Sequence, residues 1–279
     1  MSICSLLGIL LNLTLLFLAI FKSPETIKAY SAILINVSVY NIISSITQFL
    51  TKARLIRLDN YIVVVSNGFC NASETTVCYT LFAFMLHAFS HVQWCTLLSF
   101  IFSYIVLRSG KIGWNTISLL LLLIYTPSVI QFIAFLLPSD HLNPHKIIGT
   151  TPLSSFAIFY TVFNMSVTPI PIIIAVFIIR FKCIQFLSEN NQHLQEDTRK
   201  LHKQFIKSIT FQAIYPTLFA VSGLIFLILQ SYDRSAIVFE FSIFIIFALM
   251  PVISPLVYIV FIAPYRKTIL TLTKCQKTK

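Results

Sequence analysis

Charged side chains are scarce in this chain of 279 residues. They make up 10% of the sequence, while 57% of the residues are hydrophobic; soluble domains carry about 25% charged residues. Nearly all of the length falls into apolar stretches, which leaves no room for a separate soluble domain. The six cysteines follow neither a paired disulfide framework nor a zinc-binding spacing.

The motifs of soluble enzymes are also missing. The sequence contains no G-x-S-x-G, no phosphate-binding P-loop and no H-E-x-x-H, which mark hydrolases, nucleotide-binding proteins and metalloproteases. We therefore expect no catalysis, no cofactor and no metal. The formal charge of +11 could indicate a nucleic-acid partner. The basic residues lie between apolar stretches, however, which is typical of membrane proteins, so we expect no nucleic acid.

Long hydrophobic stretches are what the sequence has in abundance. A bilayer core of about 30 Å needs roughly 20 helical residues to cross it. Seven stretches meet this length, at residues 2–21, 29–51, 78–107, 114–137, 156–179, 208–229 and 240–263. No A-x-A-type cleavage site follows the first one, so we expect it to remain as a crossing. The sequence predicts an all-α, seven-helix bundle in the lipid bilayer, one domain over residues 1–279.

The basic residues predict the orientation of this bundle. Fifteen of the 20 lie in segments 22–28, 108–113, 180–207 and 264–279, and five lie in 52–77, 138–155 and 230–239. Cytoplasmic loops carry the excess of Lys and Arg, so the N-terminus is expected outside. Asn71-Ala72-Ser73 then lies outside as a usable glycosylation sequon. The sequons at Asn12, Asn36 and Asn164 fall inside crossings and should stay unmodified.

The crossings hold almost no ionisable groups apart from histidine. Pumps and proton-coupled transporters usually carry such groups at mid-membrane depth, and many transporters show an internal repeat, which this sequence lacks. Both absences favour a receptor over a transporter. Prolines instead interrupt the crossings, and each removes one backbone hydrogen bond and kinks its helix; they are Pro127, Pro169, Pro171, Pro216, Pro251 and Pro255.

The last third of the chain contains four motifs in order, Leu201-His202-Lys203-Gln204, Ile209-Thr210-Phe211-Gln212-Ala213, Pro251-Val252-Ile253-Ser254-Pro255-Leu256 and Pro264-Tyr265-Arg266. Their order resembles that in the nematode chemosensory seven-helix receptors, most closely serpentine receptor class delta (Srd). Met85-Leu86-His87 and Ile124-Tyr125-Thr126-Pro127-Ser128 agree with it. The family pattern reads close to Phe-Arg-Tyr at the inner end of helix 3, where this chain has Phe102-Ser103-Tyr104.

This resemblance implies a G-protein-coupled chemosensory receptor in the plasma membrane of sensory cilia. A small-molecule ligand is expected in an outer cavity between helices 3, 5, 6 and 7, lined by Phe84, His87, His91, Tyr160, Asn164, Phe219, Phe226 and Phe247. A heterotrimeric G protein is the expected cytoplasmic partner, with Arg108, Arg199, Lys203 and Arg266 as contacts. A transporter and a ligand-gated cation channel are the alternative functions.

A switch element is suggested near the end of helix 7. Ser254-Pro255-Leu256-Val257-Tyr258 resembles the N-P-x-x-Y element of rhodopsin-like receptors, with serine in place of asparagine. Pro255 frees a carbonyl, and the hydroxyl of Tyr258 could change hydrogen-bond partners. Pro216 is the corresponding pivot in helix 6. The basic segment 180–207 before that helix can face a G protein or anionic lipid headgroups.

Cysteine and histidine pairs leave several interpretations open. Cys70 and Cys78 lie on the expected outer, oxidising side, where we expect a disulfide between them, with two free thiols as the alternative. His87 and His91 are four residues apart on one helix face, as are His141 and His145 outside. A di-iron desaturase would need more histidines than the six in this chain, and a zinc site is disfavoured as well. Hydrogen bonding between helices and a polar edge of the ligand cavity are the interpretations that remain open.

Overall fold

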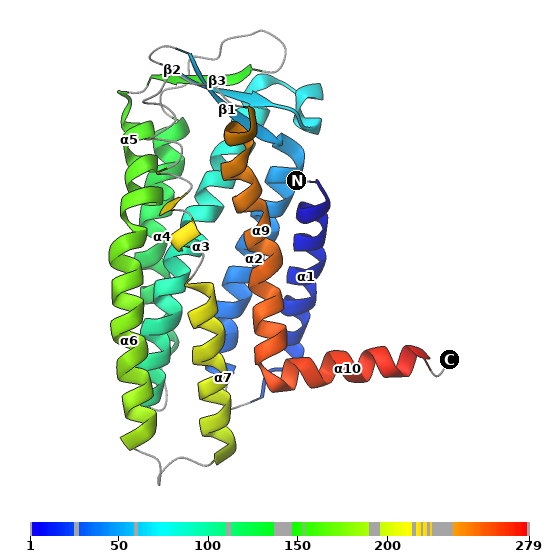
Figure 1. The fold of residues 1–279 in the computed structure, drawn as a ribbon, viewed down its shortest axis with the longest axis vertical. Coiled ribbons are helices and arrows are strands. Elements are labelled where there is room, and N and C mark those ends of the chain that lie inside the picture. The colour runs from blue at the N-terminus through cyan, green and yellow to red at the C-terminus, as the bar shows by residue number, and fades with distance from the viewer. Residues whose placement is uncertain are drawn as a thin grey trace.

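A bundle of long helices with a small sheet at one end forms the computed structural model (Figure 1). The structure describes residues 2–24, 28–58, 61–109, 113–136, 147–152, 154–189, 196–213, 216–218, 220, 221, 224 and 237–277. Its helices are α1 (Ser2–Phe21), α2 (Lys28–Thr51), α3 (Thr75–Ser109), α4 (Trp114–Leu136), α5 (Phe156–Val162), α6 (Pro169–Glu189), α7 (Glu196–Gln212), α9 (Ile237–Phe261) and α10 (Ala263–Lys277).

Six helical segments within the described residues are long and apolar enough to cross a membrane. They begin and end close to six of the ranges expected from the sequence. The fifth differs most, because α5, the π-helix η3 (Phe163–Val167) and α6 follow one another and continue to Glu189. The stretch predicted at 208–229 begins inside α7, and most of its remainder lies outside the described residues.

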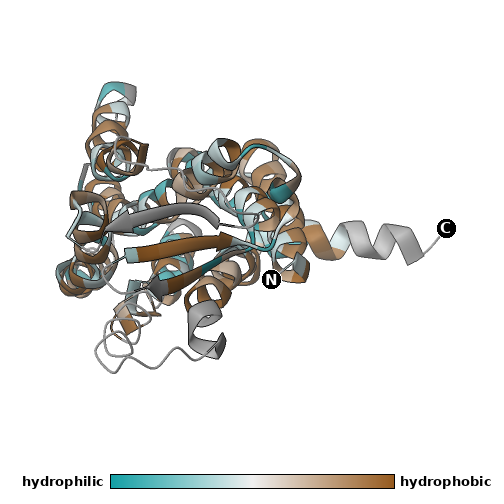
Figure 2. Cartoon of the chain, turned by 90° about the horizontal axis from the view of Figure 1, so that it is seen from above, coloured by the Kyte–Doolittle hydropathy of each residue, from teal (hydrophilic) through white to brown (hydrophobic). Residues whose placement is uncertain are grey.

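Helix α3 occupies the centre of the bundle. It packs against α2, α4, α6 and α7, while α1 packs against α2 and α9. In the most apolar 18-residue segment of α3, 72% of the residues are buried, whereas 22% are buried in the corresponding segment of α4. Leucine, isoleucine and phenylalanine side chains remain exposed on the outer helices, and Figure 2 shows hydrophobic colouring around the bundle. This apolar exterior suits lipid, since every backbone polar group in hydrocarbon must bond internally, as helices allow.

A three-stranded antiparallel sheet lies across the end of the bundle that carries segments 52–77 and 147–152. Its strands are β1 (Ala53–Leu58), β2 (Tyr61–Ser66) and β3 (Ile147–Pro152), in the order β1-β2-β3. Seen from above, the strands run over the helix ends (Figure 2). Loops were predicted in these segments, and the prediction was wrong for the strands. The β-branched run Ile62-Val63-Val64-Val65 carries the strand signal, and Ile62, Val63 and Val64 are buried.

Candidate functional site

The end of the bundle that the sequence predicts to lie outside, called the outer end below, is held together by the segment between β2 and α3. Cys70 and Cys78 form a disulfide, with Cα atoms 5.3 Å apart. Cys70 belongs to η2 (Phe69–Ala72) and Cys78 to the first turns of α3, so the bond joins this segment to the central helix. Both cysteines pack with Ala53 of β1 and Val64 of β2 in one buried cluster. The sheet is thereby fixed over the outer helix ends.

Asn71 is exposed beside this disulfide, at the same end as the sheet. Its amide donates to the Ser66 carbonyl, 2.9 Å away, and its side chain remains open to solvent. In cells, the wild-type chain should therefore carry an N-glycan that a glycosidase removes, while Asn71→Gln should migrate like the deglycosylated protein. Asn12→Gln is the matched control, because Asn12 is fully buried and should carry no glycan. An unglycosylated wild type would contradict the proposed orientation.

His87 and His91 face α2 and α4. The His91 ring lies 4.0 Å from that of Tyr40 on α2, and the His87 ring lies 5.2 Å from that of Tyr125 on α4, centroid to centroid. Phe84 lies on the same side, with its ring 4.6 Å from Phe132 of α4. Phe84, His87 and His91 therefore lie on a different side of α3 from the predicted one, since they were expected to line a cavity with the fifth, sixth and seventh crossings.

The two histidines therefore contribute to helix packing. Asn36 of α2 lies 2.9 Å from His91 Nε2 and donates to Cys95 Sγ at 3.3 Å. This geometry corresponds to the interpretation as hydrogen bonding between helices. No group of three or more His, Cys, Asp or Glu residues that could hold a metal ion occurs within the described part of the chain; His141 and His145 lie outside it.

Asn164 lies at the centre of a buried hydrogen-bond cluster in the outer half of the bundle. It sits in the π-helix η3, a feature frequent at functional sites. Its amide donates to Ser90 of α3 and to Gln131 of α4, and its side-chain oxygen accepts from the Trp94 indole. Gln93 donates to the Asn164 backbone carbonyl, 3.1 Å away. Asn164 was predicted from the sequence as a ligand residue, whereas its partners on α3 and α4 were not predicted.

One acceptor in this cluster has no partner. Gln93 is 1% exposed, and its Oε1 makes no hydrogen bond within the described structure. A buried polar atom without a partner is costly, and such groups in native structures call for an explanation. An incoming donor group would satisfy it. A ligand that places a donor against this atom would gain one hydrogen bond there.

The remaining predicted ligand residues are spread over the outer half. The Tyr160 hydroxyl donates to the Pro127 carbonyl at 2.9 Å, linking α5 to α4. Phe247 of α9 packs its ring 4.5 Å from Phe89 of α3, next to the Gln93 side of the bundle. Phe219 and Phe226 lie outside the described residues.

A second polar cluster surrounds the prolines of α9. Pro255 has no N–H, so the carbonyl of Pro251 loses its helical partner. The amide of Asn12 on α1 replaces it, donating to Pro251 O at 2.6 Å. Asn41 of α2 donates to the Asn12 side-chain oxygen at 3.3 Å. A Cβ on Gly8 would lie 2.8 Å from Ser45 Oγ and 3.1 Å from Pro251 Cβ, so the glycine permits this close approach.

The predicted switch residues Ser254 and Tyr258 of α9 contact Gln212 at the end of α7. Gln212 Nε2 donates to Ser254 Oγ at 3.2 Å, and the Tyr258 hydroxyl donates to Gln212 Oε1 at 2.9 Å. Ser254 and Tyr258 are buried. Gln212 was not predicted as a site residue, although it stands in a motif that carried the family resemblance. Pro216 is buried as well. The amide of Gln212 joins α7 to the kinked part of α9.

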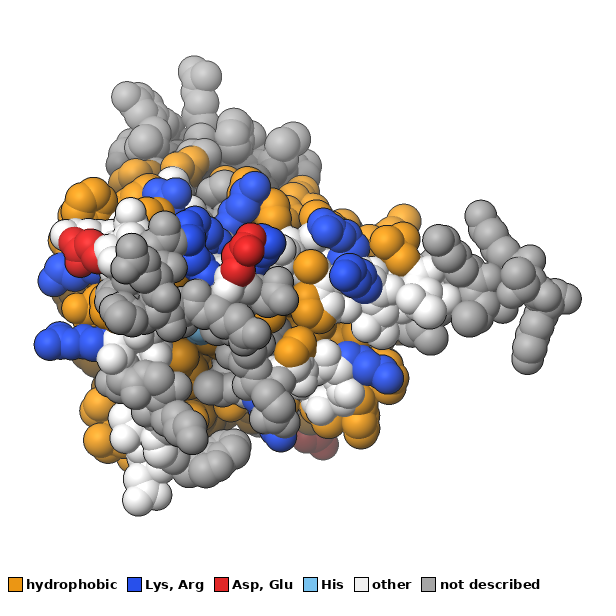
Figure 3. Space-filling model, turned by 90° about the horizontal axis from the view of Figure 1, so that it is seen from below, with side chains coloured by type: hydrophobic (Ala, Val, Ile, Leu, Met, Phe, Trp, Pro, Cys, Tyr) orange, Lys and Arg blue, Asp and Glu red, His pale blue; other side chains and the backbone are white. Residues whose placement is uncertain are grey.

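The opposite end of the molecule is basic. Figure 3 shows Lys and Arg side chains gathered on the face seen from below, with few acidic ones among them. Arg108, Lys203 and Arg266 are exposed there, and Arg199 is half-buried. Glu196 pairs with Lys200 at 2.7 Å, and the hydrogen bond from Lys200 lowers the pKa of that carboxyl. Positive charge thus remains available for an acidic partner or for lipid headgroups.

His202 of α7 is buried at this end, and its pKa gives a testable pH dependence. Its Nδ1 lies 3.1 Å from the Tyr30 hydroxyl of α2. Burial lowers the pKa of His202 below its ordinary value. The stability that depends on neutral His202 is therefore complete above the unfolded pKa of about 6.5 and is lost as the pH falls below it.

Thermal unfolding of the purified protein should show this loss. Between pH 7.5 and pH 5 the Tm of the wild type should fall further than that of His202→Gln, which has no imidazole to protonate. The His141→Gln variant provides a histidine control from the outer segment. Parallel decreases in wild type and His202→Gln would contradict the assignment of the pH effect to His202.

Comparison with known proteins agrees with this architecture. The family described as "Serpentine type 7TM GPCR chemoreceptor Srd" matches residues 1–143 and 136–271. Serpentine receptor class delta-19 of Caenorhabditis elegans is 28% identical over 285 residues, covering 95% of this chain and 84% of the relative. Serpentine receptor class delta-18 (28%, covering 95% and 85%) and class delta-1 (25%, covering 94% and 77%), from the same organism, are also similar.

The family match extends over nearly the whole chain, including the stretch predicted as the sixth crossing. The apolar spans, the helix bundle and this match lead to one assignment. The chain belongs to the Srd family of serpentine seven-transmembrane chemoreceptors and is a multi-pass membrane protein.

Proposed function

We propose that this receptor binds a small molecule in the outer half of its bundle and signals to a heterotrimeric G protein. The observation that carries the ligand site is the buried cluster around Asn164, with the unpartnered acceptor of Gln93 beside it. Phe89 and Phe247 provide aromatic surface on the neighbouring side of α3. Ligand pockets typically combine apolar walls with a few polar groups that fix orientation.

The inner half of the bundle contains the prolines and the polar contact that support the proposed signalling step. Pro251 and Pro255 interrupt α9, and Gln212 ties α7 to that region. A ligand that prefers one of two arrangements shifts the balance between them. In this proposal the sixth crossing, which begins in α7, pivots near Pro216, and α9 pivots near Pro255. The basic inner face then opens to the G protein.

The experiment is a ligand screen in transfected cells with cyclic-nucleotide and calcium readouts. A compound that activates the wild type should lose about tenfold in potency on Gln93→Leu, the typical effect of one lost hydrogen bond in a buried site. Thr126→Val, which alters an exposed hydrogen bond within α4, is the control and should change potency less. Equal potency on wild type and Gln93→Leu would exclude the site at Gln93.

A further inference from the structure

Tyr30, near the inner end of α2, contacts α7 through both its hydroxyl and its ring. It is 1% exposed, and its hydroxyl lies 3.1 Å from His202 Nδ1. Its ring packs 4.1 Å from that of Phe205, also on α7. His202 and Phe205 are three residues apart, so they lie on one face of α7. Tyr30 thus makes one polar and one apolar contact with the same face of α7.

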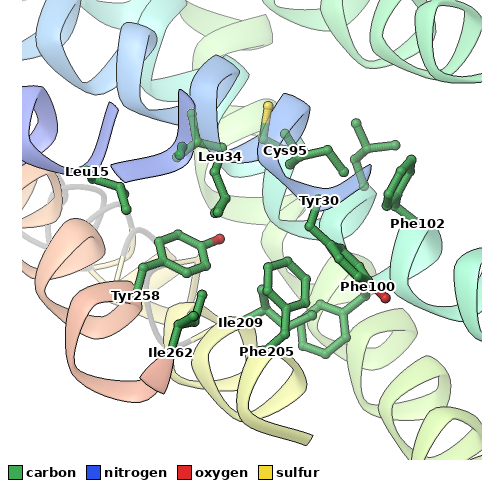
Figure 4. Packing of buried hydrophobic residues seen from close by; sticks show 14 of the residues in the cluster. Leu15, Tyr30, Leu34, Cys95, Phe100, Phe102, Phe205, Ile209, Tyr258 and Ile262 are labelled. Atoms are coloured by element: carbon green, nitrogen blue, oxygen red, sulfur yellow. The ribbon is translucent and has the colours of Figure 1, made fainter. Parts of the chain in front are cut away.

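Helix α3 contributes mainly apolar contacts at this level. Phe100 and Phe102 belong to the cluster that contains Tyr30 and Phe205, as the close view shows (Figure 4). The Ser103 hydroxyl donates to the Ser99 carbonyl of its own helix, 2.8 Å away, and lies within reach of the Tyr30 hydroxyl. Ser103 carries no charge with which to bind α7. Tyr30 of α2 therefore provides the polar contact to His202, while Gln204 of α7 separately accepts from the Ala263 N–H of α10 at 3.0 Å.

The same contact is linked to the prolines of α9. Phe205 stacks on Tyr258, with ring centroids 6.2 Å apart, and the Tyr258 hydroxyl donates to Gln212. The rings of Tyr30, Phe205 and Tyr258 thus connect α2, α7 and α9 in sequence (Figure 4). A displacement of α7 away from the bundle would separate Tyr30 from His202 and Phe205 together.

We propose that the Tyr30–His202 contact holds the inner half of α7 against α2 and keeps the G-protein side of the receptor closed until ligand binds. This inference rests on the proposed function, because it names the side chains that set its resting state. A single hydrogen bond between neutral groups changes a two-state ratio by about fivefold. That is strong enough to bias the resting state and weak enough for a ligand to overcome.

The test measures α7 directly, without ligand or G protein. Spin labels on Lys22→Cys and Glu196→Cys, in full-length receptor with Cys4 and Cys275 changed to serine, report the distance between the inner ends of α1 and α7. Lys22 and Glu196 are both exposed. Tyr30→Phe keeps the ring and removes only the hydroxyl, so the ratio of long to short distances should rise about fivefold. His202→Leu should give the same rise.

The double variant Tyr30→Phe/His202→Leu should show less than the sum of the two single increases, because each change removes the same Tyr30–His202 bond. Tyr104→Phe is the matched control, since Tyr104 at the inner end of α3 makes no hydrogen bond through its hydroxyl within the described structure, and its distances should match the wild type. Near-native Tm values would show that the variants fold. Unchanged distances in folded Tyr30→Phe, or additive effects in the double variant, would overturn the proposal.

Basal signalling separates this proposal from the proposed function. If the distances lengthen and basal G-protein activity rises with them, both are supported. If the distances lengthen without any signalling, the Tyr30–His202 contact still controls α7, and the coupling to a G protein is what fails.

Discussion

Replacing Gly68 with alanine should remove most of the folded receptor from the cell surface. Gly68 precedes η2 and lies directly against the end of α2. A Cβ at this position would stand 1.9 Å from the Leu50 carbonyl oxygen and 2.7 Å from the Thr51 carbonyl carbon. Both are backbone atoms, which cannot move aside as the end of a flexible side chain can. The segment carrying Cys70 would be pushed away from α2.

The cost should be about 3 kcal/mol, at the upper end for inserting one carbon into packed structure. Surface labelling in cells and the Tm of purified protein measure it, and the Tm should fall by on the order of 5–10 °C. Gly113→Ala is the matched control, because a Cβ there meets nothing within 4 Å. A Gly68→Ala variant as stable as Gly113→Ala would show that this segment does not pack on α2 as described.

The helices could be predicted from sequence because hydrocarbon imposes one requirement on each of them. A long apolar stretch has to satisfy its backbone internally, so length and hydropathy suffice to place it. The predicted range 2–21 coincides with α1, Ser2–Phe21. The outer sheet could not be found this way. Its strands have six residues each and lie beside stretches whose apolar signal is far stronger.

The site residues show a different limit. Histidine, tyrosine and phenylalanine in a crossing indicate polar or aromatic contacts, but not the direction in which they point. Hydropathy does not fix the rotation of α3, since its polar and apolar residues surround the helix. The sequence could thus not show that His87 and His91 face Tyr40 and Tyr125. Gln93, two residues from His91, points to Asn164 instead.

Asn12→Leu should destabilise the bundle by about 2 kcal/mol, because it leaves two buried groups without partners. The Pro251 carbonyl loses the amide that replaces its missing helical donor. The Asn41 amide loses its acceptor on Asn12. Neither group can turn to water, since Asn12 and Asn41 are 0% and 2% exposed. Thermal unfolding in detergent or nanodiscs measures the loss, and Thr14→Val, an exposed position on the same helix, should cost much less.

A double-mutant cycle with Pro255→Ala tests the reason for this loss. Alanine at position 255 restores an N–H that can bond to the Pro251 carbonyl within α9. If Asn12 acts by satisfying that carbonyl, Asn12→Leu should cost less in the Pro255→Ala background than in the wild type, by about 1 kcal/mol of coupling. The Asn41 amide would still lack its acceptor, so part of the loss should persist. Equal losses in both backgrounds would mean that Asn12 stabilises the bundle through Asn41 or packing, and that the carbonyl freed by Pro255 needs no partner from α1.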